Sequence, residues 1–116
     1  MLMAYSAQMA DTMRTDLGGG HVFTEKKMFG GLCFFLHGNM VCGVGGQGAL
    51  YRPGKASEAE ALAFGGVAPM IMGGARRMGG FVRLDNDRFN DASLRATLTD
   101  LSLAHAAGLP PKAATP

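Results

Sequence analysis

The sequence has little charge and no excess of one sign. Eleven Lys and Arg residues against nine Asp and Glu residues give a formal net charge of +2, and charged residues make up 17% of the 116 positions. The small positive excess is divided evenly between the two halves of the chain. A basic arm and an acidic tail are therefore excluded, and charge alone indicates no nucleic-acid partner.

Long apolar runs and targeting signals are also missing. The longest uncharged stretch, from Met28 to Tyr51, contains seven glycines as well as histidine, asparagine and glutamine, which would be costly in a helix that faces lipid. No basic residue precedes Arg14, and no cleavage site of small residues follows an apolar run near the N-terminus. We therefore expect a cytoplasmic protein that has no membrane partner.

Cysteine is scarce, and its spacing fits no metal or redox motif. Cys33 and Cys42 form no CxxC pair, and His21 and His37 are the histidines near them in sequence. A zinc site and a Cys–His nucleophile are the alternatives to two buried free thiols. Because nothing in the sequence marks a thiol of low pKa, we expect two free thiols. We also expect no metal, no cofactor, no catalytic residue and no enzyme activity.

A two-residue turn at Gly38-Asn39 would fix how the strands around these cysteines pair. It would place Phe35 opposite Cys42 and put Cys33 on the face of Cys42, two places along. Diagonal neighbours of this kind lie about 7 Å apart, which is beyond the reach of a disulfide.

Glycine, by contrast, is abundant. The 18 glycines fall mostly in pairs and indicate many tight turns between short elements. Apolar spacing, turn signals and cap residues predict helices over residues 5–17, 59–64 and from 90 or 91 to 107, and strands over residues 26–29, 32–36, 40–44, 49–52, 69–72 and 78–84. The apolar stripe of the last helix is expected to consist of Leu94, Leu98, Leu101 and a partly buried His105.

This order, αββββαββα, without an internal repeat or a long linker, predicts an α+β fold. We expect a two-layer arrangement in which an antiparallel sheet has its helices packed on one face. A single domain is expected over residues 1–109, followed by a flexible tail over residues 110–116.

Several motifs have both a structural and a functional interpretation. The segment from Gly43 to Gly48 has the GxGxxG spacing of phosphate-binding loops, but a strand stopped by Pro53 follows it where that motif needs a helix, so we predict a hairpin loop. The nine methionines are expected to fill the core, with an adaptable protein-binding surface as the alternative. Two basic pairs, Lys26-Lys27 and Arg76-Arg77, are expected to be solvated, with a phosphate-contacting patch as the alternative.

The most distinctive string is Met28-Phe29-Gly30-Gly31. Its landmarks and those that follow it are, in order, Lys27-Met28-Phe29-Gly30-Gly31-Leu32-Cys33-Phe34, Gly38-Asn39-Met40, Leu50-Tyr51-Arg52, Pro69-Met70, Met78-Gly79-Gly80-Phe81-Val82 and Leu109-Pro110. This pattern resembles the TfoX N-terminal domain family, whose hallmark is a basic residue followed by Met-Phe-Gly-Gly and later a strand that ends in Leu-Tyr-Arg or Leu-Tyr-Lys. The resemblance extends from about Tyr5 to Lys112.

The resemblance implies a regulatory module and supplies no catalytic residues. Members occur in bacterial regulators of natural competence, in which the domain helps to activate competence genes together with the cyclic-AMP receptor protein. We therefore expect a non-enzymatic, cytoplasmic regulatory or protein-interaction module that works with the transcription machinery. The alternative is a weak nucleic-acid-binding domain that uses the basic hairpin residues, and a homo-oligomer is left open.

We interpret the family motif as structural. It comprises Met28, Phe29, Gly30, Gly31, Tyr51 and Arg52. The two consecutive glycines interrupt what would otherwise be one long strand, so they are expected to let the chain turn or approach another backbone closely. The alternative is that the missing side chains leave backbone open to a partner.

Overall fold

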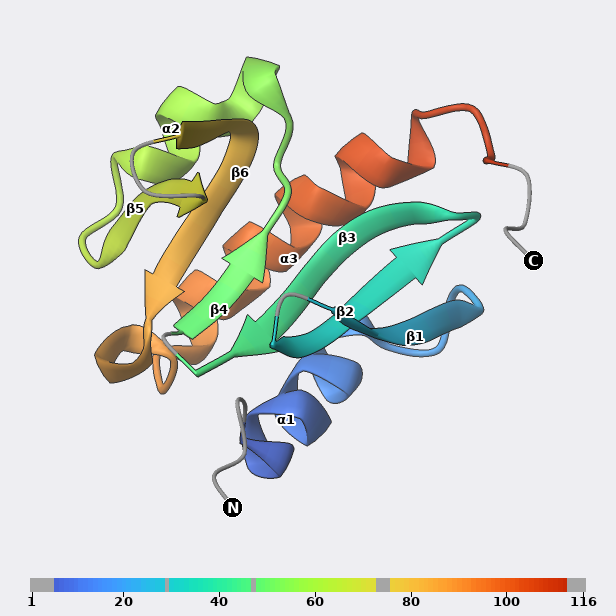
Figure 1. Cartoon of the computed structure of the whole chain (residues 1–116), viewed down its shortest axis with the longest axis horizontal. Coiled ribbons are helices and arrows are strands. Elements are labelled where there is room, and N and C mark those ends of the chain that lie inside the picture. Colours follow the sequence, from blue (N-terminus) through green and yellow to red (C-terminus); the bar gives the residue numbers. More distant parts are fainter. Residues whose placement is uncertain (1–5, 29, 47, 73–75, 113–116) are drawn as a thin grey trace.

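A computed structural model of the chain describes residues 6–28, 30–46, 48–72 and 76–112, with the side chains of residues 72, 76 and 77 left out. In this part of the chain, six strands form one antiparallel sheet in the order β1-β2-β3-β4-β6-β5 (Figure 1). The strands are β1 (Phe23–Met28), β2 (Gly31–Leu36), β3 (Asn39–Gly45), β4 (Gly48–Tyr51), β5 (Val67–Met72) and β6 (Arg76–Asp85). The helices are α1 (Ala7–Leu17), α2 (Glu58–Leu62) and α3 (Ala92–Ala107), with short 3-10 turns at Lys55–Ser57 and Asn86–Arg88. The predicted α+β class and element order are confirmed.

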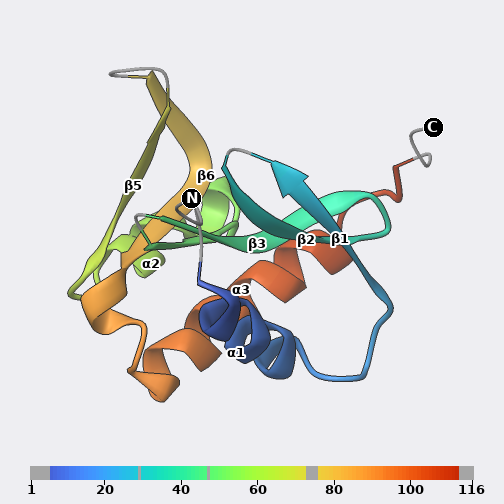
Figure 2. The same ribbon diagram turned by 60° about the horizontal axis from the view of Figure 1, so that its bottom comes forward.

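The helices pack on one face of the sheet, which we call the covered face. In Figure 2, α1 and α3 lie on the lower side of β2 and β3, whereas β5 and the adjoining part of β6 rise on the other side. The main core forms between the covered face and the helices, and its buried members are Ala10, Met13, Leu17, Leu32, Phe34, Leu36, Val41, Cys42, Val44, Ala49, Tyr51, Ala61, Val82, Leu84, Phe89, Leu94, Leu98 and Ala106. Because side chains alternate along a strand, the residues between these positions point to the opposite side, which we call the open face.

Both long helices begin at side-chain caps. Ser6 accepts a hydrogen bond from the Met9 amide at 3.3 Å, and Asp91 accepts one from the Leu94 amide at 3.0 Å, so Asp91 rather than Asn90 caps α3. α1 ends at Gly18, whose φ of 73° suits glycine. Within the described residues, no helix combines the length and the apolar character needed to cross a membrane.

The buried face of α3 differs from the predicted stripe. Leu94 and Leu98 are buried and His105 is partly buried, as expected, but Leu101 is only partly buried. Thr99, Ser102 and Ala106 complete the buried face. The helix is therefore rotated toward two small polar side chains, which hydrophobic periodicity does not detect.

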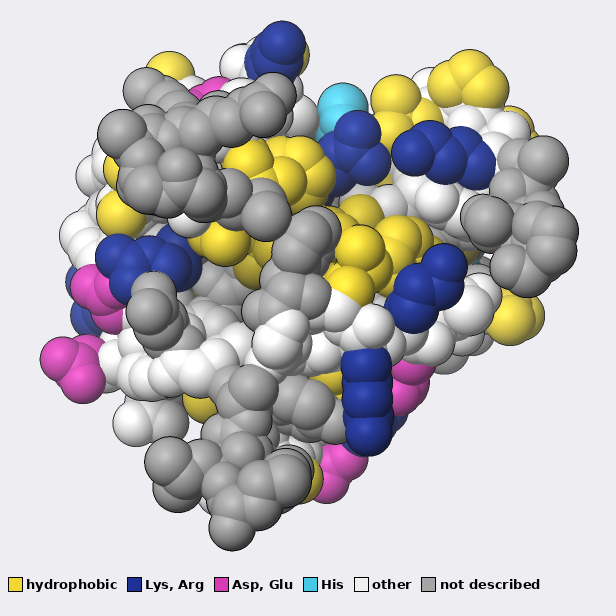
Figure 3. All heavy atoms as spheres, viewed as in Figure 1, with side chains coloured by type: hydrophobic (Ala, Val, Ile, Leu, Met, Phe, Trp, Pro, Cys, Tyr) yellow, Lys and Arg dark blue, Asp and Glu magenta, His cyan; other side chains and the backbone are white. Residues whose placement is uncertain are grey.

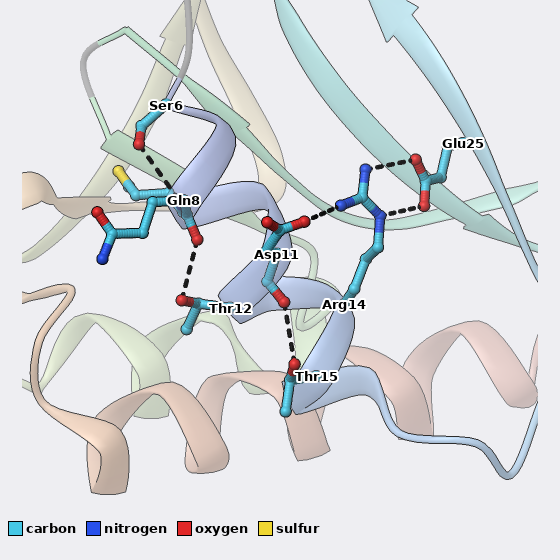
Figure 4. A network of polar contacts seen from close by, with 8 residues as sticks. Ser6, Gln8, Asp11, Thr12, Arg14, Thr15 and Glu25 are labelled. Carbon is cyan, nitrogen blue, oxygen red and sulfur yellow. Dashed lines mark hydrogen bonds and ion pairs between the residues drawn. The ribbon is translucent and has the colours of Figure 1, made fainter.

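A polar network fixes α1 to the edge of the sheet. The Arg14 guanidinium donates to both carboxylate oxygens of Glu25 on β1, with the bond to Oε1 at 2.9 Å, and also donates to Asp11 (Figure 4). The hydrogen bond from Arg14 holds the pKa of the Glu25 carboxyl below its usual range. Glu25 therefore faces the helix side of the sheet.

The β2–β3 hairpin differs from the predicted pairing. Its turn consists of His37 and Gly38, with φ of 51° and 81°, so that Leu36 pairs with Asn39. Positive φ at both central residues belongs to the type I′ turn, whose twist matches the strands, whereas the prediction placed the turn at Gly38-Asn39. Asn39 instead donates its side-chain amide to the Pro110 carbonyl at 3.0 Å.

A bulge after this turn separates the two cysteines. Phe35 pairs with Met40, but Phe34 pairs with Cys42, so one extra residue of β3 shifts the register. Cys42 consequently lies in the main core, while Cys33 lies in the cluster on the open face. The predicted placement of both cysteines on one face is wrong, because one extra residue reverses the faces of all that follow.

The segment after α3 is attached to the same hairpin. Lys112 donates its amide to the His37 carbonyl at 2.8 Å, next to the contact between Asn39 and Pro110. Pro110 and Lys112 belong to the stretch, residues 110–116, for which the sequence predicts a flexible tail. Residues 113–116 lie outside the described part of the chain.

Candidate functional site on the open face

The open face carries a second apolar cluster. Its buried members are Cys33, Met40 and Leu50, and the partly buried side chains packed against them are Met28, Phe35, Met70 and Phe81. Figure 3 shows hydrophobic side chains gathered over the middle of this face, with Lys and Arg side chains around them. In the described part of the chain, no helix packs on this cluster.

The face is hollowed by a cavity of about 590 Å³. Met28 and the β1–β2 turn form one wall, and Pro69, Met70 and Ile71 of β5 form another. The floor consists largely of glycine backbone, contributed by Gly31, Gly43, Gly45, Gly46 and Gly48. A cavity of this size, lined mainly by apolar groups, is typical of binding sites.

The glycines of the floor serve different purposes. A side chain at Gly31 would collide with the Val44 carbonyl, and one at Gly43 would lie 2.9 Å from both the Cys33 sulfur and the Leu32 carbonyl oxygen. These two positions allow β2 and β3 to approach each other. At Gly45, by contrast, the nearest atom to an added Cβ is the Gly48 carbonyl oxygen at 3.8 Å, which is an ordinary contact. Packing within the described residues therefore does not require glycine at position 45, where its absence of a side chain enlarges the hollow.

Cations lie over the aromatic rings of the open face. The Lys26 ammonium lies 5.5 Å from the centroid of the Phe35 ring, and the Arg52 guanidinium lies 5.3 Å from that of Phe81. Partial burial lowers the pKa of Arg52, which indicates that its charge is partly removed from water. Arg83 lines the hollow, with Asp85 at 3.5 Å from its guanidinium.

The family-motif residues fall into two groups. Met28 lines the hollow, Gly30 has a φ of 71° in the β1–β2 turn, and Gly31 closes that turn by pairing with Met28. Phe29 lies outside the described residues. The positive φ and the close approach at Gly31 both support the structural interpretation of the glycine pair.

Tyr51 and Arg52 point to different layers. Tyr51 is fully buried on the covered face, close to Thr99 of α3, and burial raises the pKa of its phenol above its usual range. Arg52 follows β4 and lies on the Phe81 ring. The motif therefore contributes one core residue and one residue at the rim of the open face.

The two basic pairs lie on different strands of the sheet. Lys26 lies on Phe35, whereas Lys27 alternates to the side of Glu25, so the two neighbours point to opposite faces. Arg76 and Arg77 begin β6, opposite Met72 and Ile71, and their side chains are outside the description. β1 is an edge strand and β6 is four strands away in the sheet order.

The two thiols occupy different environments, and burial raises the pKa of both. Burial raises the pKa of Cys33 to about 11, and burial raises the pKa of Cys42 further above its ordinary value. Both cysteines are free. In the part of the chain that the structure describes, no cluster of three or more His, Cys, Asp or Glu residues is placed to hold a metal ion.

The glycine-rich segment forms the predicted hairpin. Gly45 pairs with Gly48 across the β3–β4 turn, and β4 follows directly. Gln47 lies outside the described residues. His105 packs against Gly54, and burial, with a smaller effect of the Arg52 charge, lowers its pKa.

Sequence reasoning missed the open face as a unit. Phe35 and Phe81 lie on strands that are distant in sequence, and their cation partners become visible only when the strand pairing is known. The sequence offers one signal of this face. In β2, Gly31, Cys33 and Phe35 alternate with the core residues Leu32, Phe34 and Leu36.

Comparison with known proteins gives one match. The model of the TfoX N-terminal domain family matches residues 17–106 of the 116-residue chain, which includes every strand of the sheet. No curated protein and no solved structure matches the chain.

Proposed function

The chain belongs to the TfoX N-terminal domain family, and from this premise we propose that it is a non-enzymatic regulatory module that binds another protein through its open face. The observation that carries the proposal is the hollow of about 590 Å³ on the sheet face opposite the helices. We further propose that this module works in transcription or competence regulation in the bacterial cytoplasm, as the family resemblance implies.

The composition of the open face supports a protein partner. Its exposed and partly exposed apolar side chains include Met28, Met70 and Ile71, and Ile71 is 47% exposed. Methionine side chains adapt to the shape of a partner, and apolar surface of this kind on a folded domain marks interaction sites. The aromatic and arginine side chains at the rim are of the types enriched where binding energy concentrates.

A matched pair of glycine variants tests the proposal. Gly45→Leu adds an isobutyl group at the hollow, where the nearest described atom to the new Cβ is 3.8 Å away, whereas Gly19→Leu adds the same group where nothing described lies within 4 Å of the new Cβ. The immobilised proteins are used to capture partners from a lysate of the native cells. We expect one or more proteins to be captured by the wild type and by Gly19→Leu but lost with Gly45→Leu.

Three outcomes would contradict the proposal. One is that no protein is captured specifically, and another is that capture is unaffected by Gly45→Leu while this variant melts like the wild type. The third is that Gly45→Leu abolishes only the self-association of the chain, as measured by sedimentation, and leaves the capture of other proteins unchanged.

Nucleic-acid binding is a second candidate that one observation favours. The structure places Phe35 and Phe81, each with a cation, on the exposed side of an antiparallel sheet, and proteins that bind single strands use such aromatic and basic faces. Mobility-shift measurements with single-stranded oligonucleotides at two salt concentrations test this candidate. Binding through phosphates must weaken steeply as salt rises.

A further inference from the structure

We propose that the occupant of the hollow is an acidic, amphipathic segment of the partner protein, which places apolar side chains in the hollow and carboxylates against Lys26, Arg52 and Arg83. This inference rests on the function proposed above and adds the chemistry of the partner to it.

The floor of the hollow favours large apolar side chains over polar ones. Glycine at positions 43, 45 and 48 brings backbone to the surface, and the walls are supplied by Met28, Met70 and Ile71. In β3 and β4 the carbonyl and amide groups of the floor are already engaged in the strand pairing between Gly45 and Gly48 and between Gly43 and Leu50. An occupant therefore gains mainly from apolar contact and from the shape of the hollow.

The positive charges lie at separate places on the open face, and of the three cations only Arg83 lines the hollow. Lys26 is on β1 and Arg83 is on β6, four steps away in the sheet order, which corresponds to about 19 Å along the sheet. Arg52 follows β4, three steps from β1, or about 14 Å. A compact anion such as phosphate cannot contact all three cations, whereas a longer peptide segment can. If that segment is helical, about 13 residues are needed to span 19 Å.

The nearby carboxylates do not compensate for these cations equally. Glu25 is held by Arg14 on the covered face, and Glu58 accepts a hydrogen bond from the Gly80 amide at 2.8 Å. Asp85 lies beside Arg83. In the described part of the chain, Lys26 and Arg52 contact aromatic rings and form no ion pair. Their charges are therefore available to a carboxylate, and bringing one to them adds attraction without breaking an internal bridge.

An acidic protein segment fits these features better than a nucleic acid does. The described lining of the hollow contains methionine, isoleucine and leucine and no aromatic ring on which a base could stack, and the rings of Phe35 and Phe81 lie outside it. Aliphatic side chains with flanking carboxylates satisfy both parts of the site. The protein segment is therefore the favoured occupant of the hollow, and binding of a nucleic acid there would contradict it.

Peptide selection on the intact chain tests the inference. The probe is a displayed library of random peptides about 13 residues long, the length of helix that spans the cations. We expect the selected peptides to be enriched both in Asp and Glu and in Leu, Ile, Met and Phe. Binding of a selected peptide should be lost with Gly45→Leu and kept with Gly19→Leu.

A matched pair of lysine variants tests the charge. Lys26→Glu reverses a charge on the open face, and Lys27→Glu reverses its neighbour on the other face. We expect Lys26→Glu to weaken a selected peptide about three- to tenfold and Lys27→Glu to leave its affinity within about twofold. Alkylation of Cys33, which lines the hollow, should slow when the peptide is bound, with Cys42 as the internal reference.

The outcomes separate this inference from the proposed function. Selected peptides without acidic enrichment, or equal effects of the two lysine variants, overturn the acidic occupant. If Gly45→Leu still abolishes capture of a cellular protein in that case, the proposed function stands. The inference is also overturned if no peptide is selected, or if a single-stranded oligonucleotide displaces a selected peptide. The second result would show that the open face binds nucleic acid.

Discussion

The two faces of the sheet are built from the same strands and have opposite compositions. In β2, the covered face receives Leu32, Phe34 and Leu36, and the open face receives Gly31, Cys33 and Phe35. The covered face is filled by branched aliphatic and aromatic side chains that contact helices, whereas the open face has glycine, sulfur-containing and aromatic residues with cations at its rim. The contrast indicates that stability is concentrated on one side and that the other side is available for binding.

The largest expected effect compares two adjacent phenylalanines. Phe34 is 1% exposed in the main core, so Phe34→Ala should reduce the free energy of unfolding by about 3–5 kcal/mol. Phe35 is only partly buried on the open face, and Phe35→Ala should cost about 1–2 kcal/mol, because less area leaves water there on folding. Urea unfolding of both variants measures the difference.

Equal costs at the two positions would break the comparison. They would show that the open face is as tightly packed in solution as the covered face. In that case the hollow would contribute to folding, and its apolar side chains would give no argument for a partner.

The next effect compares two glycines of the floor. Gly31→Ala brings a methyl group onto the Val44 carbonyl and should destabilise the fold by about 1–3 kcal/mol, because the backbones of β2 and β3 must separate. Gly45→Ala meets nothing closer than 3.8 Å. It should leave the free energy of unfolding unchanged or raise it by up to about 1 kcal/mol, because alanine has less freedom in the unfolded chain.

Thermal unfolding of the two alanine variants in parallel measures this contrast. A loss at Gly45 as large as the loss at Gly31 would show that position 45 needs glycine for the fold. The filling variant would then no longer separate binding from folding.

The fold was predictable to the level of its elements because the covered face dominates the sequence pattern. The apolar alternation of Leu32, Phe34 and Leu36 and the cap of the last helix are local signals, and they agree with the structure. The register was not predictable, because it depends on a turn in which His37, a residue with a side chain, has positive φ. The bulge at β3 has no local signal either, and it decides which face receives Cys42.

The candidate site was predictable only in part. The glycine pair at residues 30 and 31 was recognised as a point where the chain turns, which its geometry supports. Gly45 could not be distinguished from Gly31 in the sequence, since both stand next to another glycine. They differ only in how closely the backbone of the neighbouring strand approaches them. The pairing of Lys26 with Phe35 requires knowledge of strand order, which a single sequence does not provide.

A smaller effect is expected from a buried hydroxyl on the covered face. The hydroxyls of Tyr51, Thr99 and Ser102 are buried and form no hydrogen bond of normal geometry within the described part of the chain, although Thr99 lies near enough to Tyr51 to act on its pKa. Tyr51→Phe keeps the ring and removes the polar atom, so the free energy of unfolding should stay the same or rise by up to about 1 kcal/mol. A loss of more than about 1 kcal/mol in urea unfolding would show that the phenol is satisfied in solution and that the covered face contains a working polar contact.

The smallest expected effect is a pH dependence that originates at the junction of the two faces. Burial against Gly54, and to a lesser degree the Arg52 charge, lowers the pKa of His105 in the folded protein. The unfolded chain then binds more protons than the folded one, so stability is full above the usual histidine pKa of about 6.5 and falls as the pH drops below it. Glu25 and Asp91 also have lowered pKa values, but their stabilisation is lost only at lower pH, below the usual carboxyl values of 4.5 and 3.8.

Urea unfolding between pH 7 and pH 5 isolates the histidine, because the carboxyl groups remain ionised in most of this window. We expect His105→Gln to flatten the dependence seen in the wild type. Arg52→Gln should flatten it only in part, since burial is the larger cause of the shift and remains in that variant. A wild-type stability that rises on acidification over this range would mean that the folded protein favours the protonated ring. The charge of Arg52 on the open face would then have no effect on stability through His105.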